Sequence, residues 1–208
     1  MHFNKKRSGN INISDKKRMF IAINLDKDIK HLIMNMQEKI NGLIKKNVNI
    51  KYVDSKNLHI SLKFLGDLNS IESEKVSLAL KKISFQYNPF DITLTKNIGI
   101  FTNRNIPRVI WIGIKTGSNK LKEICSSIEQ ELINETFLRI EKNFIPHITI
   151  GRIKKIKYKD ELVKNLKNIN FKDSEDIKQN IQSIELMESQ LTPNGPIYRL
   201  LNKFPFLQ

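Results

Sequence analysis

Two short segments of the chain repeat one pattern of chemically active residues. Residues 59–62 read HISL and residues 147–150 read HITI, so in both a histidine is followed two positions later by a hydroxyl residue. The surrounding residues alternate between polar and apolar, which is typical of a β-strand with one buried face. The predicted polar faces hold His59, Ser61 and Lys63 on the first strand, and His147 and Thr149 on the second.

Two imidazoles on either side of one substrate suit an in-line displacement at phosphorus. One would take a proton from the attacking oxygen and the other would protonate the leaving oxygen, because a pKa near 6.5 makes both forms available. Hydroxyls of Ser61 and Thr149 would bond the non-bridging oxygens, and Lys63 would hold phosphate or RNA backbone by charge. A gap of roughly 5 to 8 Å between the ring nitrogens of His59 and His147 would fit one phosphate.

Other chemistries fit the sequence less well. A lone histidine on a strand is more often structural, but here the motif occurs twice. Zinc needs three or four ligands, and Cys125 is the only cysteine, so we predict no metal. Serine catalysis lacks a nucleophile elbow, and we expect His59 and Ser61 to be too rigidly parallel on one strand to pair. Without a glycine-rich phosphate loop, ATP is not implied, and we predict no cofactor.

The charge of the chain points to a polyanionic partner. Lys and Arg number 36 against 21 Asp and Glu, which gives a net charge of +15. Nucleic acid is the commonest polyanion, although a general bias toward Lys, Ile and Asn would also raise the charge. No apolar run is long enough to span a membrane. The single cysteine excludes an intrachain disulfide and favours a reducing compartment such as the cytoplasm.

The remaining pattern predicts one bilobal domain at residues 18–208. Residues 1–17 are basic and lack a hydrophobic period, so we expect a flexible arm, or alternatively an organellar address. Strand, helix, short strand and histidine strand occur once from Met19 and again from Val109; a short strand at Phe137–Glu141 belongs to the second copy. Two βαβ-type halves predict an α+β fold, with antiparallel-rich sheets lining a central cleft and helices outside. Such closed pseudo-symmetry makes a monomer sufficient.

The two motifs also carry a family resemblance. HISL and HITI resemble the H-x-S/T-x signatures of the two-histidine phosphoesterases, and in particular the RNA 2′,3′-cyclic phosphodiesterases, also called 2′-5′ RNA ligases. The resemblance extends from Arg18 to about Phe204. The matching segments, in order, are residues 18–23, 59–66, 108–113, 143–152 and 191–198.

The resemblance implies hydrolysis of a 2′,3′-cyclic phosphate at the end of an RNA to a 2′-phosphate, without metal or ATP. It also implies an ability to join or cleave 2′-5′ linkages. Carried over, His59 would be the proton donor and His147 the proton acceptor, and Ser61 stands where the family often has threonine. Related alternatives are cleavage of 2′-5′ oligoadenylates or of a small cyclic nucleotide. An RNA-binding module without activity is the alternative from another class.

Three further residues are candidates for substrate binding. The resemblance assigns Arg152 to a phosphate or base contact, although strict alternation puts it on the apolar face unless a bulge at Gly151 turns it back. Alternatively, Arg152 simply reaches solvent at the end of the strand. Phe20 and Tyr198 would stack on a base, or alternatively belong to the core.

Overall fold

The computed structural model describes residues 16–44, 48–133, 144–169, 171, 177–193 and 195–207. Of the predicted arm only Lys16 and Lys17 are described, and Lys17 already begins the first strand. The strand predicted at Phe137–Glu141 lies outside the described residues.

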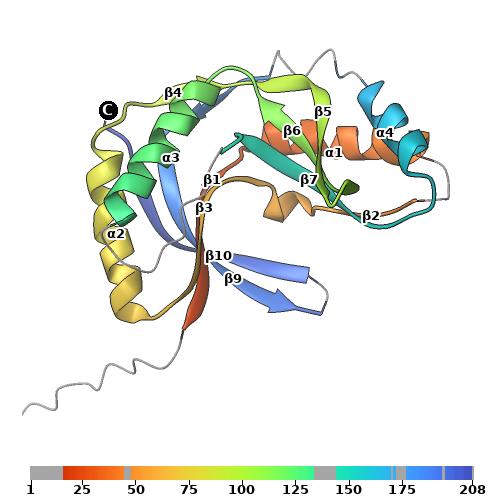
Figure 1. Cartoon of the computed structure of the whole chain (residues 1–208). Helices are drawn as coiled ribbons and strands as arrows, with labels where there is room; N and C mark the ends of the chain where they lie inside the picture. Colours follow the sequence, from red (N-terminus) through yellow and green to blue (C-terminus); the bar gives the residue numbers. More distant parts are fainter. Residues whose placement is uncertain are drawn as a thin grey trace, which may run out of the picture.

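The chain folds into strands and helices in the order that the periodicity predicts, and the α+β class is confirmed (Figure 1). The strands are β1 (Lys17–Asn24), β2 (Val48–Tyr52), β3 (His59–Leu68), β4 (Phe90–Ile92), β5 (Leu94–Asn103), β6 (Ile106–Ile114), β7 (His147–Ile156), β8 (Gln179–Ile181), β9 (Ser183–Thr192) and β10 (Gly195–Pro205). The helices are α1 (Lys27–Leu43), α2 (Ser70–Ser84), α3 (Ser118–Ile133), α4 (Lys159–Lys167) and the short 3₁₀ helix η1 (Ser55–Asn57).

The main sheet has eight strands and contains both halves of the molecule. Its order is β10-β9-β1-β3-β7-β6-β5, with β2 also paired to β7, and every pairing in it is antiparallel. Only one residue pair, Ile60 with Ile148, joins β3 to β7. The predicted halves are therefore continuous in one sheet, and the two histidine strands meet at the junction between them.

The helices pack against one face of this sheet and leave the other face for the histidines. α2 contacts α3, β9 and β10, and α3 contacts β3, whereas α1 contacts β7 and α4 contacts β5 and β6 (Figure 1). The helix of each half thus packs against the histidine strand of the other half: α1 of the first half contacts β7, and α3 of the second half contacts β3. The buried aliphatic side chains between helices and sheet form one continuous core, which fixes the two halves relative to each other.

The start of α1 illustrates why these segments fold locally. The Asp26 carboxylate accepts a hydrogen bond of 2.9 Å from the Ile29 amide, as expected for the residue that caps a helix. Ile29, Ile33 and Ile40 follow at helical spacing and are fully buried. The cap and the apolar stripe together position α1 under β7.

Each histidine strand contains, directly after the hydroxyl residue of its motif, an additional residue that the neighbouring strand does not match. In β3, Ser61 pairs with Ala22 and Lys63 pairs with Ile21, so Leu62 is the additional residue of a β-bulge. A bulge reverses the alternation of side chains along the strand. Lys63, Phe64 and Leu65 therefore lie on the faces opposite to those that strict alternation predicts. A second irregularity at Leu65, between the pairs Phe64–Phe20 and Gly66–Met19, restores the original alternation.

The same irregularity occurs at the equivalent place in β7. Thr149 pairs with Trp111 and Gly151 pairs with Ile110, so Ile150 is the additional residue. The two bulges lie at the same position of the two HxS/Tx motifs, at the fourth residue, three positions after the histidine. This correspondence supports the pseudo-symmetry that the repeat predicts.

Candidate active site

The two predicted histidines come together on one face of the sheet. Ile60 and Ile148 are Cα partners and both are completely buried toward the helices. His59 and His147 precede these isoleucines, are half-buried, and point to the opposite face. Regular antiparallel pairing places residues in this diagonal relation about 7 to 8 Å apart. The spacing is compatible with one phosphate between the two rings.

Backbone carbonyls fix the orientation of both imidazoles in the same way. Nδ1 of His59 lies 2.8 Å from the Asn57 carbonyl, and Nδ1 of His147 lies 2.7 Å from the Ile145 carbonyl. Because a carbonyl only accepts, Nδ1 carries the proton in each ring. The neutral rings therefore have an unprotonated Nε2, which is the atom that would accept a proton in catalysis.

The two hydroxyls beside the histidines are placed differently. Ser61 Oγ lies 2.8 Å from Nε2 of His59, so the expectation that these side chains cannot pair is wrong. Residues two positions apart share a strand face, and the imidazole reaches along the strand to the hydroxyl. Thr149 is half-buried on the face of His147, as predicted. Both hydroxyls thus lie beside the reaction site that the histidines define.

Burial keeps both histidines neutral in the free protein. It lowers the pKa of His59 to about 4, against the hydrogen bond to Asn57, and the charges of His147, Arg152 and Lys30 lower it further. Burial likewise lowers the pKa of His147, and Arg152 adds to the shift. An anion bound between the rings would raise both pKa values, because it favours the protonated forms.

Arg152 lies on the histidine face. The predicted bulge exists, but its additional residue is Ile150 rather than Gly151. The positive charge of Arg152 adds to the lowering that burial causes in the pKa values of His59 and His147, and it opposes the rise that burial causes in the pKa of Tyr198. The guanidinium is therefore near all three rings. A planar guanidinium at this place is suited to hold two oxygens of a phosphate.

Lys63 does not share the face of His59, and this prediction is wrong. The bulge at Leu62 turns its side chain toward the helices, where it is only 2% exposed. Its ammonium forms an ion pair of 2.9 Å with Glu129 on α3. Lys63 therefore holds α3 against β3, and Phe64, the next residue, takes the place on the histidine face.

The prediction that Phe20 stacks on a base is wrong, whereas Tyr198 lies where a substrate would be. The Phe20 ring packs 5.0 Å from His59 and 4.9 Å from Tyr198, and it is only 2% exposed. A ring covered on this scale has no face for a base, so Phe20 supports His59 instead. Tyr198 is half-buried with its ring edge-on to His59 at 5.2 Å.

Three aromatic residues of the site escaped the sequence analysis. Phe101 and Trp111 stack at 4.8 Å and contact the His147 ring at 4.9 and 5.8 Å. Phe64 lies 6.1 Å from Phe20 and is 56% exposed, so it is the ring available to a base. The alternation of polar and apolar residues along β5 and β6 could have indicated that Phe101 and Trp111 lie on the histidine face. The bulge hid Phe64, which alternation assigns to the core.

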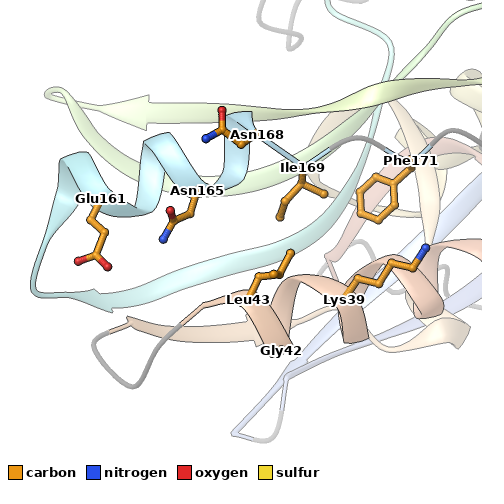
Figure 2. Close-up of a pocket in the computed structure, with 8 residues that line it drawn as sticks. All are labelled: Lys39, Gly42, Leu43, Glu161, Asn165, Asn168, Ile169 and Phe171. Atoms are coloured by element: carbon orange, nitrogen blue, oxygen red, sulfur yellow. The ribbon is translucent and has the colours of Figure 1, made fainter.

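Other parts of the described structure offer weaker sites. Among the described residues, no group of three or more His, Cys, Asp or Glu side chains is placed to hold a metal ion. A surface pocket of about 810 Å³ lies between α1 and α4 (Figure 2). It is lined by Leu43, Ile169, Phe171 and several polar side chains, and it contains none of the predicted site residues. No described helix is long and apolar enough to cross a membrane.

Comparisons with known proteins agree with this site. The chain matches the family model of the 2′-5′ RNA ligase superfamily over residues 43–192. An RNA 2′,3′-cyclic phosphodiesterase of Methanocaldococcus jannaschii is 38% identical over 190 residues, which cover 90% of this chain and 99% of the relative. A protein of the same name from Archaeoglobus fulgidus is 31% identical over 188 residues, with 90% and 99% covered.

A solved structure supports the fold independently of sequence. E. coli LigT in its apo form superposes with a TM-score of 0.74 at 21% identity, covering 94% of this chain and 100% of LigT. The continuous sheet and the paired histidines define a two-histidine phosphoesterase. Within that class, the chain belongs to the 2′-5′ RNA ligase superfamily.

Proposed function

We propose that this protein hydrolyses the 2′,3′-cyclic phosphate at the end of an RNA to a 2′-phosphate. The observation that carries the proposal is the meeting of His59 and His147 at the single junction between the two halves, each with Nδ1 fixed by a carbonyl. The names of the relatives agree with this activity. The high net charge of +15 suits an RNA substrate.

Each half supplies one proton-transfer group. Nε2 of His147 takes a proton from a water molecule, whose oxygen forms a new bond to phosphorus. The bond between phosphorus and the 3′ oxygen breaks in line with it, and His59 gives a proton to that oxygen. Arg152 holds the non-bridging oxygens, where negative charge increases in the transition state. Exchange of protons with solvent restores both histidines.

The hydroxyls complete the site. Thr149 donates to a non-bridging oxygen, and Ser61 does the same once the phosphate displaces it from His59. The assignment of His59 as donor stays a prediction. The stronger lowering of its pKa favours the reverse order in the free protein, since the group with the higher pKa keeps its proton. Binding of the anion changes both values, so kinetics must decide.

The first test is turnover of a nucleoside 2′,3′-cyclic phosphate in the presence of EDTA. The account predicts hydrolysis to the 2′-phosphate, and losses on the order of 10²- to 10⁴-fold for His59→Ala and for His147→Ala. The absence of turnover by the wild-type protein, or full activity of either variant, would contradict it. Loss of activity in EDTA that returns with added metal would contradict the metal-free mechanism.

Joining or cleavage of 2′-5′ linkages is the second candidate activity, and the superfamily name favours it. Incubation with 2′-5′ and 3′-5′ linked dinucleotides, with identification of the products, separates it from cyclic phosphate hydrolysis. A binding module without activity would bind RNA with a steep salt dependence and turn over nothing.

The monomeric state, the metal-free active site and a reducing cellular compartment belong to the same proposal. Sedimentation at working concentration tests the first of these.

A further inference from the structure

A row of four residues crosses the histidine face beside the active site. Lys51 on β2 is the Cα partner of Arg152 on β7, which is the partner of Val109 on β6, and Val109 is the partner of Phe101 on β5. Lys51 and Arg152 are both exposed. Side chains at directly opposite positions of adjacent strands point to the same face with Cβ atoms about 5 Å apart. Lys51 therefore accompanies Arg152 onto the histidine face.

Two cations at this spacing repel each other. Like charges directly opposite on neighbouring strands destabilise a sheet, and phosphates bound side by side at the two cations relieve the repulsion. The partner of Arg152 on its other side is the apolar Val109. Within the described ranges, Arg152 forms no ion pair with a carboxylate. Lys51 and Arg152 thus have the charge and spacing to bind two neighbouring phosphates, one at each cation.

The start of β10 places Lys51 next to the catalytic face. A Cβ added at Gly195 would lie 3.2 Å from the Lys51 ammonium, so the chain passes close to that group. Gly195 has φ of +132°, which disfavours any other residue there. The side-chain amide (Nδ2) of Asn57 donates to the Pro196 carbonyl at 3.1 Å and fixes this segment. Tyr198, two residues further, contacts His59. A continuous path connects the histidines to Lys51.

We propose that Lys51 binds the phosphate that precedes the terminal nucleoside, beside the reacting phosphate at Arg152 and the histidines. The proposal rests on the proposed function and adds a subsite to it. Its ligand is the 5′-phosphate of the terminal nucleotide, which every RNA has and a nucleoside 2′,3′-cyclic phosphate lacks. The subsite makes an RNA end a better substrate than the isolated cyclic nucleoside.

The kinetic test compares two substrates that differ only in this phosphate. Adenosine 2′,3′-cyclic phosphate and its 5′-phosphorylated form are hydrolysed by wild type, Lys51→Met and Lys51→Arg. Lys51→Met should lower kcat/KM about ten-fold for the 5′-phosphorylated substrate and leave the other unchanged, because one charged contact is lost. Lys51→Arg should keep most of the preference. Lys122→Met on the exposed face of α3 is the matched control.

A binding measurement keeps the subsite testable if neither substrate is turned over. Calorimetry compares adenosine 2′-monophosphate with adenosine 2′,5′-bisphosphate. The wild-type protein should bind the bisphosphate more tightly, and Lys51→Met should remove that difference.

Equal losses on both substrates, or no loss on either, would overturn the proposal. A selective loss in Lys30→Met without one in Lys51→Met would also overturn it, because Lys30, like Arg152, is a cation whose charge acts on His59. Failure of the proposed function has a different signature, which is no hydrolysis of either substrate by the wild-type protein.

Discussion

The side-chain amide of Gln37 on α1 donates a hydrogen bond of 2.9 Å to the carbonyl of Ile150, the bulged residue of β7. The same side-chain amide also donates at 2.9 Å to the Val53 carbonyl. The backbone amide of Val53 in turn donates to the Ile150 carbonyl at 3.1 Å. The bulge is what returns Arg152 to the histidine face. A helix on the opposite face of the sheet therefore helps to position a residue of the site.

Replacing Gln37 by leucine should impair the site through Arg152. The Val53 and Ile150 carbonyls each lose the hydrogen bond from Gln37, and only the Val53 amide still donates to Ile150. The bulge loosens, and kcat/KM should fall about ten-fold. Because Arg152 lowers the pKa values of both histidines, its displacement should raise them, which NMR titration of the imidazoles measures. In an Arg152→Met background the same change should have little further effect. Additive losses would show that Gln37 acts on stability alone; Glu38→Gln is the control.

A methyl group at position 99 should disturb His147 through its aromatic neighbours. A Cβ on Gly99 would overlap the indole of Trp111, which contacts the His147 ring. Gly99→Ala should therefore lower kcat at least ten-fold and cost about 1 to 3 kcal/mol of stability through overpacking. Gly42→Ala, where an added Cβ meets nothing within 4 Å, is the matched control and should retain full activity. Full activity of the Gly99→Ala variant would show that Trp111 does not support His147 in catalysis.

Lys63→Met should damage stability and spare substrate binding. The substitution leaves the partly buried carboxylate of Glu129 without its 2.9 Å partner, which costs about 3 kcal/mol, the upper end for a hydrogen bond to a charged group. For a chain of this size that corresponds to a fall in Tm of roughly 6 to 12 °C. KM for an RNA ending in a cyclic phosphate should be unchanged below the melting range. A raised KM at unchanged Tm would contradict this prediction and show that Lys63 binds phosphate.

The pH dependence should differ between free and substrate-bound protein. Burial lowers the pKa of His59 to about 4 and also lowers that of His147, so the proton donor of the free protein loses its proton below pH 6.5. A bound phosphate raises the donor pKa. The alkaline limb of kcat/KM should therefore lie at lower pH than the alkaline limb of kcat. Coincident limbs would show that the anion does not contact the donor.

Sequence periodicity predicted the positions of the histidines but not of the residues that follow them. His59 and His147 begin their strands, before any irregularity, so alternation places them correctly. Lys63 and Phe64 follow the bulge at Leu62, and there alternation gives the wrong face. Which residue bulges depends on the register with β1 and on support from other elements, such as the Cys125 thiol that donates to the Leu62 carbonyl at 3.3 Å. Such partners are distant in sequence.

Burial of aromatic rings was equally hard to predict from one strand. Phe20 and Phe64 lie on the same face only 6.1 Å apart, yet the first is covered and the second exposed. The difference comes from β9 and β10, which bring Met187 and Tyr198 over Phe20. A local pattern carries no information about these later strands, so the identity of the exposed ring requires the fold.

The most direct test of the account is a crystal structure with adenosine 2′-monophosphate bound. The account predicts one phosphate between the two strands, with Nε2 of His59 and Nε2 of His147 each about 2.6 to 3.2 Å from a different oxygen on the same phosphorus atom. A phosphate held by one histidine while the other ring faces away, or bound outside the Ile60–Ile148 junction, would contradict the two-histidine mechanism.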